Sequence, residues 1–263
     1  MSTQRRSVLR RALRILDTFS DAADGLSLSE LSRRAGVPLT TTHRIVGELY
    51  EWGALERDDA GNYRVGLRLW EIAALAPRSV GLQRIALPFM QDLYETTHRG
   101  VHLAVRTDDE VVFVERFVSP ERASARPRVG GRYALHATAV GLVLLAHAPV
   151  EVQQEVLSRP LEPYTPHTYS SERELREVLA DVRRSGYAVS DRQIDPEYVS
   201  VAAPIYGSDD TVVAALSLIV PHTESHGPGL GHLVQATARG ISRALGATRP
   251  PLPHPSSGIR KGG

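Results

Sequence analysis

The chain has 263 residues, of which 42% are hydrophobic and 23% are charged, as is typical of a globular protein of one or two domains. It contains no cysteine, which excludes disulfides, thiolate metal sites and cysteine nucleophiles. The net charge is only +1, so nucleic-acid binding must be argued from where the charges lie.

The amino terminus is basic but has no apolar core long enough for a cleavable signal peptide. The longest apolar runs, residues 139–148 and 212–220, are too short to cross a bilayer. We therefore expect a cytoplasmic protein with no membrane partner. Residues 1–6 are expected to be disordered.

A first amphipathic helix is predicted over Ser7 to Phe19, because apolar residues recur there at helical spacing. The expected buried stripe consists of Val8, Leu9, Ala12, Leu13, Ile15, Leu16 and Phe19. The charged residues before Ile15 are all arginines, namely Arg5, Arg6, Arg10, Arg11 and Arg14. This concentration favours DNA binding, although a solvated helix face has the same pattern.

The next stretch, LSELSRRAGVPLTTTHRIVG at Leu28 to Gly47, predicts two short helices around a tight turn. Ser27 and Glu30 have the spacing of a capping box, which opens the first of these helices. Gly36 permits the left-handed conformation that ends it, and Pro38 suits the start of the next helix.

The second helix of this pair has two distinct faces. Its inward positions are Thr42, Ile45, Val46 and Leu49. Its outward positions are Leu39, Thr40, Thr41, His43 and Arg44. Hydroxyls bind phosphate or contact a thymine methyl, and arginine binds guanine, so this face suits a major groove. The pattern predicts a helix-turn-helix with DNA contacts from the outward residues and from Ser29; two packed helices with a solvated face are the alternative.

Two short strands follow the helix pair, at Leu55 and at Tyr63 to Val65, joined by a turn at residues 58–61. A hairpin directly behind a helix-turn-helix is a wing. Arg57 and Arg64 lie on it, where they are placed to reach phosphate.

In this region the chain resembles the IclR family of bacterial transcription regulators. The family signature runs through the first helix, the segment LSELSRRAGVPLTTTHRIVGEL and a G-x-L-E-R wing, and this chain keeps that order over Ser7 to Leu69. An apolar connecting helix is then expected from Leu67 to Ala76, ended by Pro77. Because family members pair through this helix, the resemblance implies a homodimer or a tetramer.

Beyond the connecting helix, a helix is predicted over Val80 to Thr97, with a kink or break at Pro88. Strands are predicted at 101–105, at 111–116, in a segment ending near Val129 and Gly130, at 199–206 and at 211–220. Helices are predicted at 138–146, 150–157, 171–186 and 231–245. Antiparallel strands with helices gathered at their ends indicate an α+β fold.

Two further blocks extend the resemblance, YALHATAVGLVLLA and GYAVSDRQIDPEYVSVAAPIYGSDDTVVAALSLIVP, so that it covers about residues 7 to 245. It implies an α+β protein with a winged helix-turn-helix domain (7–66), a linker helix (67–78) and a GAF-like effector-binding domain with a mostly antiparallel sheet (79–247). The remainder (248–263) is rich in Pro, Gly and Ser and is expected to be disordered.

The resemblance also implies a small-molecule site between the concave sheet and the helix that opens at Thr138. Backbone N–H groups at such a helix start favour an anion. The implied lining residues are Ala139, Val140, Gly141, Ser190, Asp191, Tyr198, Ser200 and Ser217. Ser200 and Ser217 are polar residues in apolar strands and need a partner; a hydrogen bond to a neighbouring strand is the alternative to a ligand.

The chain departs from the family pattern at three positions. The family commonly has Lys at the place of Leu142, Glu at that of Gln193, and Gly at that of Glu197. These departures leave the identity of the ligand and the geometry of the loop open.

No motif indicates a metal, a cofactor or a catalytic residue. His98 and His102, and His222 and His226, are four residues apart, but neither pair lies on a convincing helix and no H-E-x-x-H is present. The glycines at 227–231 do not form a dinucleotide fingerprint, and there is no G-x-S-x-G.

The sequence therefore predicts a ligand-responsive transcriptional regulator and no enzyme. Its expected partners are double-stranded operator DNA, a small organic effector such as a carboxylate or an aromatic acid, and a second copy of itself. We expect the regulator to repress transcription, although no residue decides between repression and activation. The alternatives are a hydrolase-type enzyme with an appended DNA-binding module, and an architectural DNA-binding protein whose second domain only oligomerises.

Overall fold

The computed structural model describes residues 7–21, 25–75, 77–119, 127–224 and 229–248. The segments 1–6 and 249–263, for which we expect disorder, lie outside the described residues. The chain divides into two compact units, Met1–Val80 and Gly81–Gly263, and each is described by itself.

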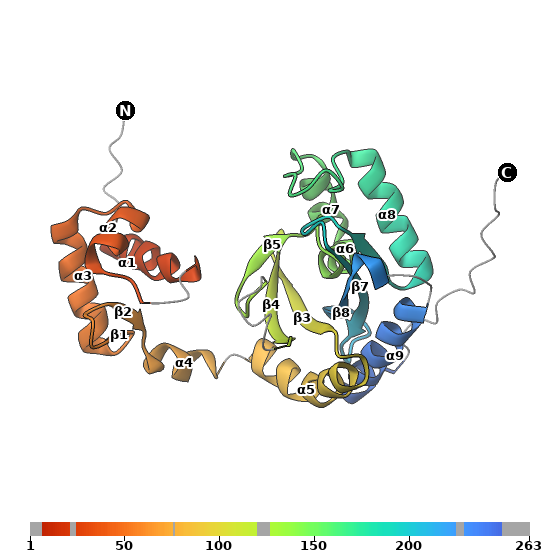
Figure 1. Cartoon of the computed structure of the whole chain (residues 1–263), viewed down its shortest axis with the longest axis horizontal. Helices are drawn as coiled ribbons and strands as arrows, with labels where there is room; N and C mark the ends of the chain where they lie inside the picture. Colours follow the sequence, from red (N-terminus) through yellow and green to blue (C-terminus); the bar gives the residue numbers. More distant parts are fainter. Residues whose placement is uncertain (1–6, 22–24, 76, 120–126, 225–228, 249–263) are drawn as a thin grey trace. The chain divides into compact units, whose positions relative to one another are not determined.

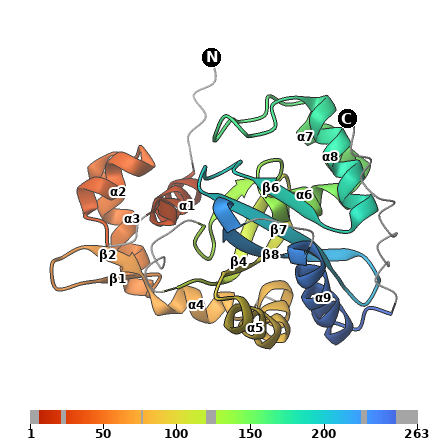
Figure 2. The same ribbon diagram turned by 45° about the vertical axis from the view of Figure 1, so that its right-hand side comes forward.

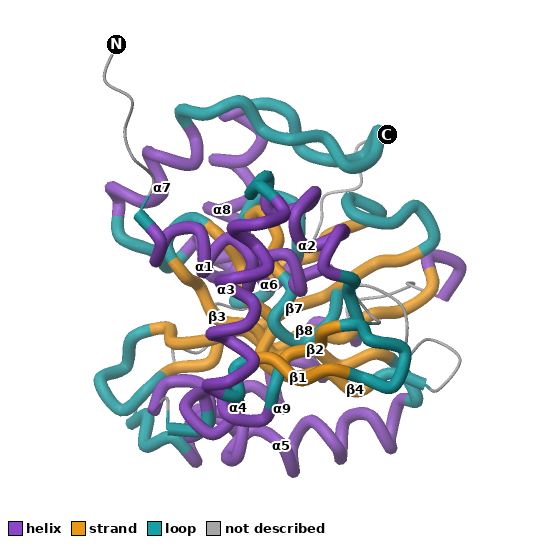
Figure 3. Tube along the Cα trace, turned by 90° about the vertical axis from the view of Figure 1, so that its left-hand side faces the viewer, coloured by secondary structure: helices purple, strands orange, loops and turns teal. Residues whose placement is uncertain are grey.

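The first unit is a group of helices followed by a hairpin (Figure 3). Its elements are α1 (Val8–Asp17), the 3-10 helix η1 (Thr18–Asp21), α2 (Leu28–Ala35), α3 (Leu39–Trp52), β1 (Leu55–Arg57), β2 (Tyr63–Val65) and α4 (Leu67–Ala73). β1 and β2 pair antiparallel. This is the predicted helix-turn-helix with its wing, and its core includes Ile15, Leu31, Ile45, Val46 and Leu55.

Local sequence signals fix the turn between α2 and α3. The predicted capping box is confirmed: the Ser27 side chain accepts from the Glu30 N–H, and the Glu30 carboxylate accepts from the Ser27 N–H. Gly36 ends α2 with a φ of 57°, a left-handed conformation that glycine adopts without strain. Pro38 then precedes the first residue of α3.

The predicted buried stripe of the first helix is wrong in part. Ile15 and Phe19 are buried, but Val8, Leu9 and Leu13 are 46%, 69% and 52% exposed. The helix also ends at Asp17. Since α1 packs on α2 and α3 along one side only, periodicity alone overestimated how much of its apolar surface this unit covers.

The connection between the units differs from its prediction. α4 ends at Ala73 and has no buried residue, and α5 (Pro77–Thr97) begins at the proline that was expected only to end the preceding helix. Proline is tolerated in a first helical turn because its missing N–H has no helical partner there. Of the kink or break expected at Pro88, the break is absent, since α5 runs through it with Ala86 and Met90 buried beside it.

The second unit is built on a six-stranded antiparallel sheet with the order β5-β4-β3-β8-β7-β6 (Figure 1). The strands are β3 (Gly100–Thr107), β4 (Glu110–Phe117), β5 (Arg132–Ala134), β6 (Ala188–Asp191), β7 (Tyr198–Tyr206) and β8 (Val212–Pro221). β5 follows the turn at Gly130 and does not end there, because the positive φ of Gly130 turns the chain first. β6, an edge strand of four residues, was not predicted.

Helices cover both faces of this sheet (Figure 2). α5 and α9 (Gly229–Ala244) pack on one face, against Val101, Leu103, Val201 and Leu216 among others. α6 (Ala139–Ala146) lies on the other face, with α8 (Glu172–Ser185) and α7 (Val150–Leu157) beside it.

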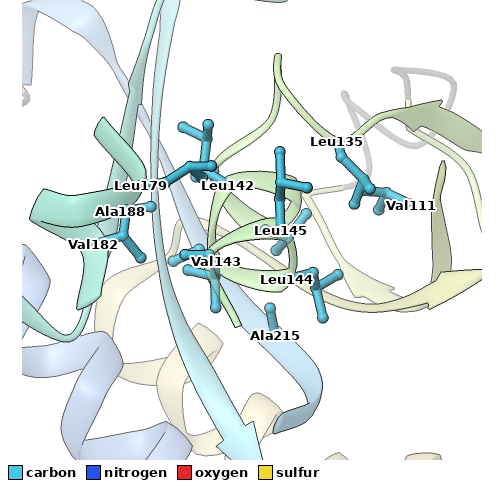
Figure 4. Close-up of a cluster of buried hydrophobic side chains, with 14 of the residues drawn as sticks. Val111, Leu135, Leu142, Val143, Leu144, Leu145, Leu179, Val182, Ala188 and Ala215 are labelled. Carbon is cyan, nitrogen blue, oxygen red and sulfur yellow. The ribbon is translucent and has the colours of Figure 1, made fainter. Parts of the chain in front are cut away.

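Every residue of α6 is buried, which explains its unbroken apolar sequence. In Figure 4 its residues Leu142 to Leu145 lie between Val111 and Leu135 on one side and Leu179, Val182 and Ala188 on the other. Alanines at 104, 202 and 215 of the sheet belong to the same cluster, and their small side chains let the helix approach closely. The amino terminus of α6 is thereby held over the sheet.

Candidate functional sites

The outward face of α3 carries the residues predicted to contact DNA. Leu39, Thr40, His43 and Arg44 are exposed and Thr41 is half-buried. Thr42 is fully buried, and its hydroxyl lies 3.2 Å from the carbonyls of Val37 and Pro38, so it stabilises the turn. Ser29 of α2 is also exposed.

Arg44 is partly restrained by its own helix. Its Nη1 lies 2.7 Å from Glu48 Oε1, one turn further along α3, and both side chains are more than half exposed. An exposed ion pair of this kind contributes little stability, so a phosphate or a base edge can replace the carboxylate at small cost.

The two wing arginines are held by contacts within the hairpin. Arg57 Nε donates to the Gly61 carbonyl at 2.9 Å, and its guanidinium lies 5.6 Å from the centre of the Tyr63 ring. Arg64 lies 3.2 Å from the Asp58 carboxylate. Both arginines are exposed, so their charges are available to an anion.

A cavity opens in the second unit between the sheet and the start of α6, with about 750 Å³ of space including its mouth. Most of the residues predicted to line it do so, namely Ala139, Val140, Ser190, Tyr198, Ser200 and Ser217. Gly141 and Asp191 are not among the described residues that line it.

Gly141 and Asp191 have other contacts. The Gly141 N–H donates to the Thr138 hydroxyl at 3.0 Å, and a Cβ at this position would lie 2.3 Å from the Leu135 carbonyl oxygen. One of the expected free N–H groups of the helix start is therefore already used. Asp191 is exposed, and the hydrogen bond from Arg192 holds the pKa of its carboxyl below the ordinary value.

Substitution of Gly141 by alanine is expected to destabilise the second unit. The added methyl meets a backbone carbonyl that cannot move aside, so we expect a loss of about 1–3 kcal/mol in the free energy of unfolding. Urea denaturation measures it. Gly47→Ala in α3 is the matched control, because nothing lies within 4 Å of its added methyl and alanine favours helices. Equal stability of the two variants would contradict this role of Gly141.

The three serines around the cavity differ in the hydrogen bonds of their hydroxyls. Ser190 Oγ donates to the Ala137 carbonyl at 2.9 Å and ties β6 to the loop before α6. In contrast, no hydrogen bond among the described residues uses the hydroxyl of Ser200 or of Ser217, although Ser217 is only 1% exposed. The alternative of a hydrogen bond to a neighbouring strand therefore does not account for these two serines.

The cavity is also lined by residues that were not predicted to line it. They are His102, Phe113, Arg116, Tyr133, Gln193 and Asp195, together with small or apolar residues such as Gly100 and Ile194. The Phe113 ring packs edge-on against His102 and Tyr133, with ring centres 5.5 and 5.9 Å apart. Arg116 Nη1 donates to the Pro127 carbonyl at 2.9 Å.

The sequence of β3 contained a signal for His102, because this polar residue interrupts a run of apolar residues. His102 lies between the buried Val101 and Leu103, and it is itself 3% exposed. It lies directly opposite Ser217 in the strand register. From the sequence alone, a polar residue that alternates with apolar ones is expected to face solvent. Its burial becomes apparent only when both faces of the sheet are known to be covered.

Within the described ranges, no three His, Asp or Glu side chains are close enough together to hold a metal ion. His226 of the second histidine pair lies outside those ranges. None of the helices in the described part of the chain has the length and apolarity needed to cross a membrane.

Comparison with known proteins identifies the class. Residues 75–243 match the family model for the carboxy-terminal domain of IclR bacterial transcriptional regulators, and residues 8–59 match the model for the IclR helix-turn-helix domain. The chain belongs to the IclR family of DNA-binding transcriptional regulators.

Individual relatives agree with this assignment. The chain is 31% identical to the regulator KipR of Bacillus subtilis, over 85% of this chain and 91% of that one. It is 29% identical to XynR of Escherichia coli K12, over 90% and 96%. An IclR homologue of Microbacterium hydrocarbonoxydans, solved in complex with 4-hydroxybenzoate, is 37% identical with a TM-score of 0.85, over 91% and 99%.

Proposed function

We propose that this regulator is a repressor that responds to a small aromatic carboxylate bound in the cavity of its second unit. The observation that carries the proposal is the cavity wall, in which the hydroxyls of Ser200 and Ser217 have no hydrogen bond among the described residues. Ser217 is buried and Ser200 half-buried, and buried hydroxyls are normally hydrogen-bonded, so a ligand is a natural partner for the Ser217 hydroxyl above all.

The surroundings of these serines suit an aromatic acid. Phe113 and Tyr133 supply ring surfaces, and Ala139 and Val140 bring the first N–H groups of α6 to the cavity. A helix start carries partial positive charge and favours a carboxylate. The 4-hydroxybenzoate bound by the 37%-identical homologue belongs to this chemical class, which supports the choice.

The DNA-binding half of the proposal concerns Ser29, the outward residues of α3 and the wing arginines. The exposed Thr40, the half-buried Thr41 and Arg44 near the start of α3 suit a major groove, and the exposed Arg57 and Arg64 of the wing suit the adjacent phosphates. Effector binding would then favour one arrangement of the DNA-binding units over another. If the two arrangements differ in their affinity for the operator, the effector causes the protein to release or to retain the DNA.

Self-association completes the proposal, as a homodimer or a tetramer. Leu67, Trp70, Ile72 and Leu75, in and just after α4, are between 52% and 79% exposed, and Val8, Leu9 and Leu13 add apolar surface on α1. Apolar side chains of this size and number mark a protein interface. We also propose that the protein acts in the cytoplasm without a membrane partner.

The operator is expected to be a near-palindrome. A two-fold protein presents two equivalent recognition helices, so the half-sites repeat with the same symmetry. Footprinting on the promoters of neighbouring genes measures this. A single asymmetric site protected by a monomer would contradict the proposed assembly.

A hydrolase would need a nucleophile hydrogen-bonded to a base. Ser217 lies opposite His102 in the strand register, and the register alone assigns neither residue a catalytic role. We therefore propose no catalytic residue, and no cofactor.

A thermal-shift screen of the intact protein against aromatic and aliphatic carboxylates tests the proposal. An aromatic acid is expected to raise the melting temperature and to change operator affinity in the same concentration range. The proposal fails if no acid does both.

The effector-binding domain is expected to be separable. The fragment 79–263 contains the sheet, the cavity and helices on both faces, which is enough to bury a core. We expect this fragment to fold, to bind the effector like the intact protein and to lack operator affinity, as measured by calorimetry and gel shift. A folded fragment that does not bind an effector of the intact protein would show that the site is shared with the first unit.

A further inference from the structure

The connection between α7 and α8 forms a strap beside the cavity. The strap comprises residues 158–171, all of them described and none of them in a helix or a strand. Its Leu161 and Tyr169 pack against the core around α6. A connection of this length without secondary structure is uncommon in a compact domain and is usually functional or disordered. This strap is fixed to two other segments by hydrogen bonds, which favours a function.

The first of these segments is residues 192–195, here called the wall segment, which lines the cavity with all of its residues except Arg192. The Thr168 hydroxyl donates to the Gln193 carbonyl at 2.7 Å, and the Thr165 hydroxyl donates to the Arg192 carbonyl at 2.7 Å. Thr168 is only 8% exposed. Two threonines of the strap therefore hold the backbone of the wall segment from behind.

The wall segment has a conformation that needs such support. Arg192 has a φ of 56°, in the left-handed region that residues other than glycine seldom adopt. A backbone of this kind persists where its surroundings hold it in place. The Arg192 N–H donates to the Tyr198 carbonyl at 3.0 Å, and the Arg192 carbonyl accepts the hydrogen bond from Thr165. The strap thus supplies one of the contacts that maintain this turn.

The second segment that the strap contacts lies just before α6. His136, which is 4% exposed, has its Nε2 at 3.0 Å from the Glu162 carbonyl oxygen. The ring of Tyr164 lies with its centre 6.3 Å from that of His136 and 6.4 Å from that of Tyr133. Tyr133 itself lines the cavity. The strap therefore joins two parts of the cavity wall that are far apart in the sequence.

We propose that Thr165 and Thr168 are positioning residues of the effector site, which hold the wall segment where it closes the cavity. This rests on the proposed function and goes beyond it. Neither threonine is among the described residues that line the cavity, so part of the effector affinity would come from residues that do not touch the effector. A wall that is already held in place loses less conformational freedom when the ligand binds.

Hydrogen–deuterium exchange of the intact, ligand-free protein is the first test. Thr165→Val and Thr168→Val each remove a hydroxyl and keep the shape of the side chain. Amide exchange at residues 192–198 is expected to become about tenfold faster in each variant, the effect of one lost hydrogen bond on local opening. Exchange along β3 is expected to stay unchanged. Thr165 is only half-buried, so its variant keeps the test decisive if Thr168→Val does not fold.

Calorimetric titration of the same proteins with benzoate and with 4-hydroxybenzoate is the second test. Each valine variant is expected to bind the probe about tenfold more weakly than the wild-type protein, which is the range for one hydrogen bond. Thr165→Ser and Thr168→Ser keep the hydroxyl and are expected to restore both the affinity and the slow exchange.

Thr237→Val is the matched control. Thr237 is half-buried in the same unit, and its hydroxyl donates to the Leu233 carbonyl of its own helix, α9, at 3.2 Å. It is not among the described residues that line the cavity. The valine substitution there is expected to change neither the exchange at 192–198 nor the affinity for either probe.

Unchanged exchange at residues 192–198 in the valine variants would overturn the inference and leave the proposed function standing. Faster exchange with wild-type affinity for the probes would do the same, because the threonines would then serve the fold alone. A Thr237→Val protein that loses as much affinity would also overturn it. If neither probe binds the wild-type protein, the proposed aromatic effector is wrong and the inference fails with it.

Discussion

Arg44→Ala is expected to abolish sequence-specific operator binding while the first unit stays folded. The Arg44 side chain is exposed on α3 and its described partner is the equally exposed Glu48, so its removal costs the fold little. A lost arginine contact to guanine weakens binding by about 1–3 kcal/mol per half-site, and a dimer loses it twice. Gel shift at fixed salt measures the affinity, and circular dichroism confirms the fold.

Glu48→Gln is the companion variant. It removes the carboxylate that lies 2.7 Å from the guanidinium and keeps the size of the side chain. Operator binding is expected to persist, with higher affinity for unrelated DNA, because one negative charge leaves a surface that faces phosphates. Unchanged operator affinity in Arg44→Ala would show that α3 is not the recognition helix.

Ser217→Leu is expected to abolish effector binding and leave DNA binding intact. The side chain of Ser217 lines the cavity from β8, and its hydroxyl has no hydrogen bond that a leucine would break. A leucine there occupies space that the ligand needs, so affinity is expected to fall at least about a hundredfold, equivalent to about 3 kcal/mol. Calorimetry of the intact protein with its effector measures this.

Ser217→Ala separates the loss of the hydroxyl from the filling of the cavity. It is expected to weaken binding by only about tenfold, the range for one hydrogen bond. A two-state melting curve for both variants shows that the sheet has not been disrupted. If Ser217→Leu binds the effector as the natural protein does, the ligand lies elsewhere.

Much of the fold could be predicted because local signals and tertiary packing agree. Ser27, Glu30 and Gly36 fix the ends of α2 wherever the helix packs, and the apolar run of α6 requires burial on all sides. Predictions failed where the burial of a side chain depends on whether another element of the fold covers it. Leu9 and Leu13 have the spacing of core residues, yet this unit offers them no surface to cover them.

The residues of the candidate cavity were likewise predictable only in part. Ser200 and Ser217 were recognisable as polar residues in apolar strands. Gln193 was noted only as a departure from the family pattern and was not predicted to line the cavity, because it lies in an irregular loop, where polar residues are ordinary; the burial of its side chain distinguishes it. Gly141 was predicted to line the cavity. Its lack of a side chain instead allows α6 to pack closely against the Leu135 carbonyl.

The face of the sheet beneath α6 carries several small residues, with Ala104, Ala202 and Ala215 under the helix and Gly100, Ser200 and Ser217 at the cavity. The hollow exists because these positions remain small, while the opposite face of the same strands holds the second core. If the effector binds here as we propose, exchanges among small residues at these positions would alter ligand choice without disturbing the second core or α3. On the proposed function, related chains could therefore acquire a new effector while keeping the old operator, so that the two specificities would evolve independently.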